Sequence, residues 1–235
     1  MSNLLNSCPA CSWVLAHGRF LAALAGGGLL AYLLGAIPFA YLFARIKGVD
    51  IRKVGSGNVG ATNVFRSVGK GWGILTFAAD ALKGLVPALV FPWLARYWLG
   101  VESRQALPLV FGCLAILGHM WPVYLGFRGG KGMATGAGAL LGIAPWSVLV
   151  GACSWVIIFL FSRTVSMASI VAVFAVAASS WRLYGPPRFP APAIPIVLTL
   201  LAALIVWRHR GNIRRLREGT EHRFEFGRRK DSKTP

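Results

Sequence analysis

Charged side chains are scarce in this sequence. Asp, Glu, Lys and Arg make up 14% of the 235 residues, and only seven residues are acidic. A soluble domain carries about 25% charged residues, so this scarcity argues against an ordinary water-soluble protein. In their place stand apolar runs of roughly 20 residues, the length that crosses a bilayer. Their approximate bounds are 20–44, 72–95, 106–125, 132–144, 146–162, 164–181 and 192–207.

Cysteine is also scarce, and four residues are too few for a disulfide framework. Cys113 and Cys153 lie in apolar runs and are expected to pack as small apolar side chains. Cys8 and Cys11 precede the first run without a second ligand pair, which favours an N-terminal extension over residues 1–18 rather than a redox or metal site. No residue pattern requires a metal, and no cofactor is expected.

The net charge of +18 comes from basic residues at the ends of apolar runs. Ten of the 25 Lys and Arg follow Trp207, and six lie between positions 45 and 70. This distribution is typical of the cytoplasmic loops of a membrane protein, which contact anionic lipid, and it argues against nucleic acid as a partner. We therefore expect a membrane domain over residues 19–223 and a basic cytoplasmic tail over residues 224–235.

Parity of the crossings predicts the topology. With the basic loop and the basic tail both cytoplasmic, the stretch 132–162 must cross an even number of times, and Pro145 is the natural break. The prediction is an all-α protein with seven transmembrane helices, its N-terminus outside and its C-terminus cytoplasmic. A re-entrant pair of short helices over 132–162 preserves the same parity and remains an alternative.

The first polar constellation follows the first apolar run, from Gly55 to Arg66. Glycines let backbone N–H groups approach a ligand, hydroxyl and amide side chains add donors, and an arginine suits two phosphate oxygens. A helix beginning near Ala61 would present Thr62 and Arg66 on one side. A flexible linker is the alternative interpretation. The candidate binding residues are Ser56, Gly57, Asn58, Gly60, Thr62, Asn63 and Arg66.

The second constellation is His119 followed by a glycine-rich turn around a lysine. The turn comprises Gly129, Gly130, Lys131 and Gly132. A lysine among glycines that opens a helix is a plausible phosphate cradle, although the Walker A spacing is absent and an ordinary helix-start turn is the alternative. Asp80 and Lys83, at helical i, i+3 spacing within the second run, are either a structural ion pair or part of the site.

The third constellation follows the last apolar run. His209 and Asn212 are three residues apart, so a helix continuing from the last span would place both on one face. Glu221 follows, and Ser166 lies where the fifth and sixth runs meet. A basic lipid-binding tail and serine-mediated helix packing are the alternative interpretations of these segments.

These motifs, in this order, resemble those of the bacterial acyl-phosphate:glycerol-3-phosphate acyltransferase family. The resemblance covers the chain from about Gly35 to Glu221. It rests on Ser-Gly-Asn-x-Gly-Ala-Thr-Asn-x-x-Arg from Ser56, Gly-His-x-x-Pro and Gly-Gly-Lys-Gly in the second constellation, and His-x-x-Asn-Ile-x-Arg-Leu with Gly-x-Glu in the third.

The resemblance implies a multi-pass enzyme of the bacterial inner membrane with its site on the cytoplasmic face. It implies acyl transfer from acyl phosphate to the 1-hydroxyl of glycerol 3-phosphate, giving lysophosphatidic acid and phosphate. We expect Arg66, Lys131, His209 and Asn212 to be catalytic and the other named residues to bind substrate. The base is either His209 or an oxygen of the acyl phosphate, with the second favoured.

Two rival functions are less well supported by the sequence. A thioester-dependent acyltransferase is disfavoured because Tyr124, Arg214 and Gly227 stand five residues after His119, His209 and His222, where the His-x-x-x-x-Asp signature needs aspartate. A transporter of a phosphorylated solute is disfavoured because the polar motifs all fall on one expected face of the membrane.

Overall fold

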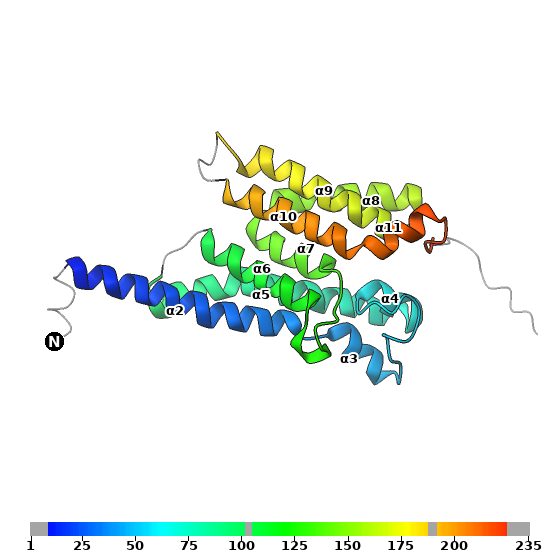
Figure 1. The fold of residues 1–235 in the computed structure, drawn as a ribbon, viewed down its shortest axis with the longest axis horizontal. Coiled ribbons are helices and arrows are strands. Elements are labelled where there is room, and N and C mark those ends of the chain that lie inside the picture. Colours follow the sequence, from blue (N-terminus) through cyan, green and yellow to red (C-terminus); the bar gives the residue numbers. More distant parts are fainter. Residues whose placement is uncertain (1–8, 102–104, 188–191, 225–235) are drawn as a thin grey trace, which may run out of the picture. The chain divides into compact units, whose positions relative to one another are not determined.

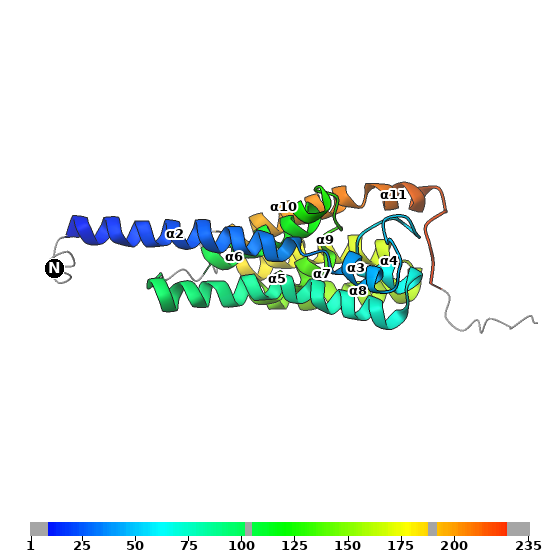
Figure 2. The ribbon, with the colours of Figure 1, turned by 90° about the horizontal axis from the view of Figure 1, so that it is seen from below.

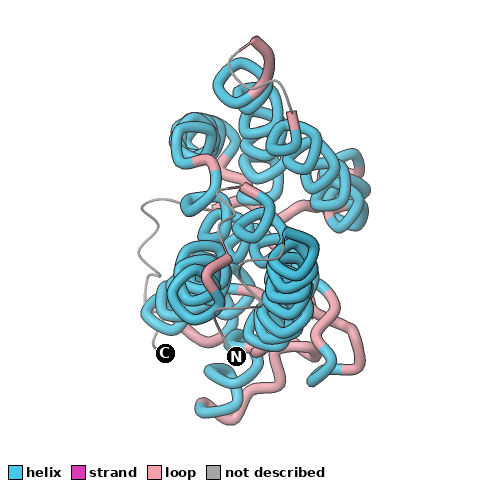
Figure 3. Tube along the Cα trace, turned by 90° about the vertical axis from the view of Figure 1, so that its left-hand side faces the viewer, coloured by secondary structure: helices cyan, strands magenta, loops and turns pink. Residues whose placement is uncertain are grey.

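The structure is a computed structural model that describes residues 9–101, 105–187 and 192–224, and every regular element among them is helical (Figure 3). This confirms the all-α class. The chain divides into two compact units, one up to Val148 and one from Leu149, and each is described by itself. The elements are α2 (Pro9–Ala36), α3 (Phe39–Ile46), α4 (Ala61–Ser67), α5 (Lys70–Leu99), α6 (Ala106–Met120), the short 3-10 helix η1 (Val123–Leu125), α7 (Met133–Ile143), α8 (Pro145–Ser162), α9 (Val165–Tyr184), α10 (Ala193–Arg208) and α11 (Arg210–Arg217).

The first unit is built around two close helix pairs, α2 with α6 and α5 with α7 (Figure 1). A Cβ added to Gly35 would overlap the Ala115 carbonyl, and one added to Gly84 would overlap the Thr135 carbonyl. Glycines therefore let the backbones touch, as small residues do in membrane helix packing. Figure 2 shows the same unit from below, with α2 and α5 extended along its length.

The first apolar run is not one straight helix. Helix α2 begins at Pro9, ends at Ala36, and is followed after a break by α3. Proline at position 38 lacks an N–H group and disfavours helical geometry in the residue before it, which explains the break. Residues 9–18 form the first turns of α2, whereas residues 1–8, with Cys8, lie outside the described residues.

Five helical segments of the described chain are long and apolar enough to cross a membrane, and the bent pair α10–α11 makes a sixth. The predicted break near Pro145 is present, since α7 ends at Ile143 and α8 begins at Pro145. Helix α7 has 11 residues and extends roughly 16 Å, about half the thickness of a bilayer's apolar core. Seven full crossings therefore stay a prediction, and so does the orientation of the termini.

The second unit contains α8 to α11, with α9 packed on α10 and contacted by α11. The indole of Trp155 on α8 donates to the Ser169 hydroxyl on α9 at 3.2 Å, so Ser169 ties these helices together. The sequence predicts that the helix of the last span continues to Asn212, but in the structure it does not. It bends by 57° at His209, where α10 ends and α11 begins. Of the predicted tail, only Phe224 lies within the described residues.

Candidate functional site

The loop before α4 is organised by the amide of Asn63. Its Nδ2 lies 3.1 Å from each of three carbonyl oxygens, those of Ile51, Val54 and Asn58, and its Oδ1 accepts from the Ser56 backbone N–H at 3.2 Å. Asn63 is 3% exposed. Through these contacts Asn63 holds the loop together, while its direct contact with substrate stays a prediction.

The predicted start of α4 at Ala61 is confirmed. Ile51, Val59 and Val64 are buried with Ala40 and Ala44 of α3, so the loop rests on an apolar base. Ser56 is exposed, while Asn58, Thr62 and Arg66 are half-buried, and Gly57 and Gly60 lie between them on the same segment. The loop is therefore anchored on an apolar base, with the Ser56 side chain exposed and those of Asn58, Thr62 and Arg66 partly accessible.

Not every cation beside this loop is available to a ligand. Arg52 binds Asp50 through two bonds, Nε to Oδ1 at 2.9 Å and Nη2 to Oδ2 at 2.8 Å. Hydrogen bonding from Arg52 holds the pKa of Asp50 below its ordinary value of 3.8, with a smaller contribution from Arg45. Asp50 is thus ionised at neutral pH and offsets part of the positive charge at the base of the loop.

The glycine turn of the second constellation folds back on the end of α6. Gly130 N–H donates to the His119 carbonyl at 3.1 Å, and Gly129 N–H donates to the Met120 carbonyl at 3.2 Å. A Cβ on Gly130 would overlap His119 Nε2 and lie 2.7 Å from the Val59 carbonyl oxygen. Only glycine fits there, and the close approach brings the first two constellations into contact.

Within this turn, Lys131 follows Gly130 directly and is half-buried. The next residue, Gly132, has φ of 85° and precedes the first residue of α7, Met133. A side chain at position 132 would be strained in this conformation and would also overlap Met120 Cε. Gly132 therefore sets the direction in which α7 leaves the turn.

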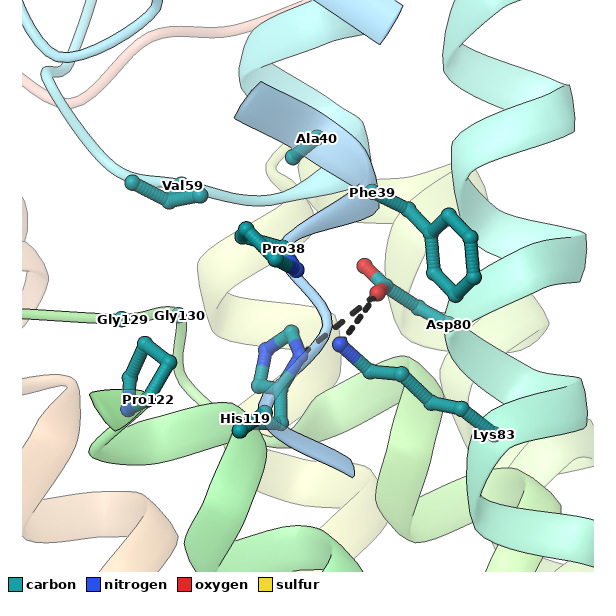
Figure 4. Close-up of a pocket in the computed structure, with 11 residues that line it drawn as sticks. Pro38, Phe39, Ala40, Val59, Asp80, Lys83, His119, Pro122, Gly129 and Gly130 are labelled. Atoms are coloured by element: carbon teal, nitrogen blue, oxygen red, sulfur yellow. Dashed lines mark ion pairs between the residues drawn. The ribbon is translucent and has the colours of Figure 1, made fainter. Parts of the chain in front are cut away.

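Beneath the turn lies a small pocket whose polar lining is Asp80, Lys83 and His119 (Figure 4). Lys83 Nζ is 2.8 Å and His119 Nδ1 is 3.6 Å from Asp80 Oδ1. The pocket has room for about one water molecule and is too small for a phosphate group. The i, i+3 pair was visible in the sequence, but its contact with His119, on another helix, was not.

The third constellation gathers on one carboxylate in the second unit. Glu221 Oε1 accepts from Ser166 Oγ at 2.8 Å and from Asn212 Nδ2 at 2.7 Å, and Oε2 accepts from Arg215 Nε at 2.7 Å. We call these four residues the Glu221 cluster. Arg215 was missed as a site residue, although its charge and its position six residues before Glu221 are visible in the sequence.

The charge of Glu221 is stabilised by its partners. Desolvation acts to raise the pKa of Glu221, but hydrogen bonds from Asn212, Ser166 and Arg215 outweigh it, so the pKa lies below its ordinary value of 4.5. The carboxylate is therefore ionised at neutral pH. It draws the end of α11 and the start of α9 together within the second unit.

His209 stands at the bend between α10 and α11 and is 2% exposed. Its Nδ1 lies 2.8 Å from the Ile205 carbonyl oxygen. Since a carbonyl only accepts, this bond places the proton of the neutral ring on Nδ1 and the lone pair on Nε2. The ring is thus held in the tautomer in which Nε2 is the basic atom.

Comparison with known proteins gives a consistent result. A family model described as glycerol-3-phosphate acyltransferase matches residues 26–219. The glycerol-3-phosphate acyltransferase of Aquifex aeolicus (strain VF5) is 45% identical over 197 residues, covering 83% of this chain and 96% of the relative. That of Geobacter sulfurreducens (strain ATCC 51573 / DSM 12127 / PCA) is 41% identical over 203 residues, covering 83% and 95%.

Two solved structures share the fold. One is the crystal structure of PlsY (YgiH), an integral membrane glycerol 3-phosphate acyltransferase, in its glycerol 3-phosphate form. It has a TM-score of 0.75 and 42% identity, and the match covers 86% of this chain and 96% of that one. The lysophosphatidic acid form has a TM-score of 0.73 at the same identity, covering 86% and 95%.

Proposed function

We propose that this chain, which belongs to the glycerol-3-phosphate acyltransferase family, transfers a fatty acyl group from acyl phosphate to the 1-hydroxyl of glycerol 3-phosphate. The acceptor is supported by the names of its relatives and by the glycerol 3-phosphate form of the similar structure. The choice of acyl phosphate as donor rests on the resemblance of the motifs. The products are lysophosphatidic acid and inorganic phosphate.

The reaction needs little covalent help from the protein. The glycerol hydroxyl oxygen attacks the acyl carbonyl carbon, a new C–O ester bond forms, and the bond from that carbon to the phosphate oxygen breaks. The hydroxyl proton ends on the released phosphate. Because the acyl phosphate is already activated, holding the two anions close together and stabilising their charge supplies much of the rate.

The observation that carries this proposal is the contact between the two glycine-rich segments. Gly130 lies so close to both Val59 and His119 that the backbone just before Lys131 and the loop before Arg66 are neighbours. We assign phosphate binding to the donors of both segments. These are the side chains of Ser56, Asn58, Thr62, Arg66 and Lys131. The N–H groups of Gly57, Gly60, Gly129 and Gly130 already donate to backbone carbonyls, so these glycines shape the two segments.

For the second unit we propose that His209 and Asn212 orient the reactants. The Nδ1–H bond to Ile205 leaves Nε2 as the atom that accepts a proton if the histidine is the base. We favour an oxygen of the acyl phosphate as the base. His209→Ala with unchanged glycerol 3-phosphate binding and nearly complete loss of turnover would contradict pure substrate assistance.

We further propose that the protein sits in a bacterial inner membrane with seven spans and the first two constellations on the cytoplasmic side. The support is the distribution of basic residues over the loop at 45–70 and the segment after Trp207. In this arrangement the acyl chain of the donor lies among lipid-facing helices.

The experiment that tests the function is a product assay on purified protein. Glycerol 3-phosphate is supplied with either palmitoyl phosphate or palmitoyl-CoA, and lysophosphatidic acid is measured. We expect product from palmitoyl phosphate alone. Product from palmitoyl-CoA alone would refute the donor assignment, and product from neither would refute the function.

A further inference from the structure

We propose that Asp80 and Lys83 are positioning residues for the phosphate-binding turn Gly129–Lys131 and act on it through His119. This inference rests on the proposed function, because it assigns a task to groups beneath the same phosphate cradle. None of the sequence motifs contains Asp80 or Lys83. Figure 4 shows the arrangement on which the inference depends.

The two charges are deeply buried. The side chains of Asp80 and Lys83 are each 2% exposed, and they lie one helical turn apart on α5. Charged groups inside membrane helices are costly, and replacing a buried ion pair by apolar side chains of similar volume is often neutral for stability or favourable. The stability of the helix bundle therefore explains the buried Asp80–Lys83 pair poorly. A role at the phosphate-binding turn explains it better.

The pair joins three segments of the first unit. Lys83 Nζ donates to the Ile37 carbonyl at 2.7 Å, at the break between α2 and α3. Asp80 Oδ1 forms an ion pair with Lys83 Nζ at 2.8 Å and lies 3.6 Å from His119 Nδ1 at the end of α6. A carboxylate at this ion-pair distance favours the ring orientation that turns Nδ1 toward it, and so sets the direction in which Nε2 points.

The orientation of His119 reaches the glycine turn directly. Its ring nitrogen Nε2 packs against the Cα of Gly130, while its carbonyl accepts the Gly130 N–H. Gly130 is thus held from two sides by one residue, and Lys131 is the next residue along the chain. A ring that is no longer oriented by Asp80 would let the turn shift, and displacements of about 1 Å cost up to roughly 100-fold in rate.

The pocket between these groups argues against direct substrate binding by the pair. It has room for about one water molecule, and the Asp80 carboxylate would repel an anion. The alternative is a purely structural role. Loss of a structural residue lowers the number of folded molecules, and so the apparent maximal rate, but leaves the affinity of each folded molecule unchanged.

The test measures affinity in folded protein. Wild type, Asp80→Asn, His119→Gln and the double variant Asp80→Asn/Lys83→Met are purified and separated from aggregate. The KM for glycerol 3-phosphate, the inhibition constant of inorganic phosphate and the dissociation constant of glycerol 3-phosphate are then measured. We expect each variant to raise at least one of these constants about tenfold or more, and the double variant to melt at a higher temperature than Asp80→Asn because it leaves no buried lysine unpaired.

Leu107→Ala is the matched control. Leu107 is fully buried on the same helix as His119, 12 residues away or about 18 Å along its axis. We expect it to lower the melting temperature through a cavity and to leave all three constants at the wild-type value.

Wild-type constants in Asp80→Asn and in the double variant, with only the rate or the melting temperature reduced, would overturn the proposal. If Asp80→Asn does not fold, Asp80→Glu replaces it, and failure of every variant at position 80 to fold would show a structural role and also overturn it. Failure of the proposed function is distinguishable, because a wild type that binds glycerol 3-phosphate without making product still allows the dissociation constants to be compared. A wild type that does not bind it would refute both.

Discussion

Each unit has one side chain that organises a polar segment, and the two differ in charge. Asn63 in the first unit is neutral and contacts mainly backbone groups of the loop that it closes. Glu221 in the second unit is ionised and contacts three side chains from α9 and α11. Both are placed next to residues that we expect to bind or orient substrate.

The neutral amide of Asn63 and the ionised carboxylate of Glu221 should respond differently to substitution and to a change of pH. An amide that satisfies carbonyls on one side and an N–H on the other has no good substitute, because its donors and acceptor are both used. A carboxylate held by several donors loses one bond at a time when a donor is removed, but loses its charge all at once when it is protonated. The loop held by Asn63 should therefore be sensitive to substitution of Asn63, and the segment held by Glu221 should be sensitive to pH.

The largest effect is expected for Asn63→Asp. The change replaces an NH2 group by a carboxylate oxygen that faces the carbonyls of Ile51, Val54 and Asn58. Each buried carbonyl left without a donor costs about 1–3 kcal/mol, and the new charge is repelled by all three. We expect turnover to fall at least about 100-fold, measured in the palmitoyl phosphate assay, together with a lower melting temperature.

Ser67→Ala is the control for this change. Ser67 Oγ lies 3.4 Å from Asn63 Oδ1, so its removal deletes one long contact and leaves the three carbonyls satisfied. Turnover of Asn63→Asp within threefold of Ser67→Ala would show that the amide does not organise the loop.

The second effect in size is expected for Glu221→Gln. The amide oxygen can still accept from Ser166 and Asn212, but Arg215 loses a charged partner at 2.7 Å. Hydrogen bonds to charged groups contribute about 1.5–3 kcal/mol. We expect a loss of stability of this order, measured by thermal unfolding, with a smaller fall in turnover than for Asn63→Asp. An unchanged melting temperature in Glu221→Gln would show that the charge of Glu221 does not stabilise the protein.

Local rules predict some breaks in these helices and miss others. The start of α4 at Ala61 and the break at Pro145 follow from local rules and were predicted. Two breaks were missed: the one at Pro38 because the surrounding run is apolar, and the bend at His209 because neither proline nor glycine precedes it. Asp80 and His119 are 39 residues apart in sequence and lie on the consecutive helices α5 and α6. No local rule predicts which residues of two neighbouring helices face each other.

The stabilisation by Glu221 should depend on pH, whereas that by Asn63 should not. Because the pKa of Glu221 is lowered on folding, the charge of Glu221 stabilises the protein above the ordinary pKa of 4.5, and this contribution is lost as the pH falls through the lowered pKa. The difference in melting temperature between wild type and Glu221→Gln should therefore be full at pH 7 and shrink below about pH 4.5.

Asn63 carries no titrating group, so the difference between wild type and Asn63→Ala should stay constant over the same pH range. Melting curves of all three proteins between pH 7 and pH 4 measure both differences. A wild type to Glu221→Gln difference that does not shrink in acid would show that the carboxylate is not the source of the stabilisation.

The smallest effect is expected for Ser166→Ala. Ser166 contributes one of three donors to Glu221, and it is 4% exposed, so little new surface reaches water when the hydroxyl is removed. A hydrogen bond to a charged group contributes about 1.5–3 kcal/mol, but Asn212 and Arg215 remain to hold the carboxylate and keep the loss at the low end of this range. Thermal unfolding should show a loss smaller than that of Glu221→Gln, while the KM for glycerol 3-phosphate reports a separate property. If that KM rises by tenfold or more with little change in stability, Ser166 contacts the substrate as the sequence predicts, and its bond to Glu221 is secondary.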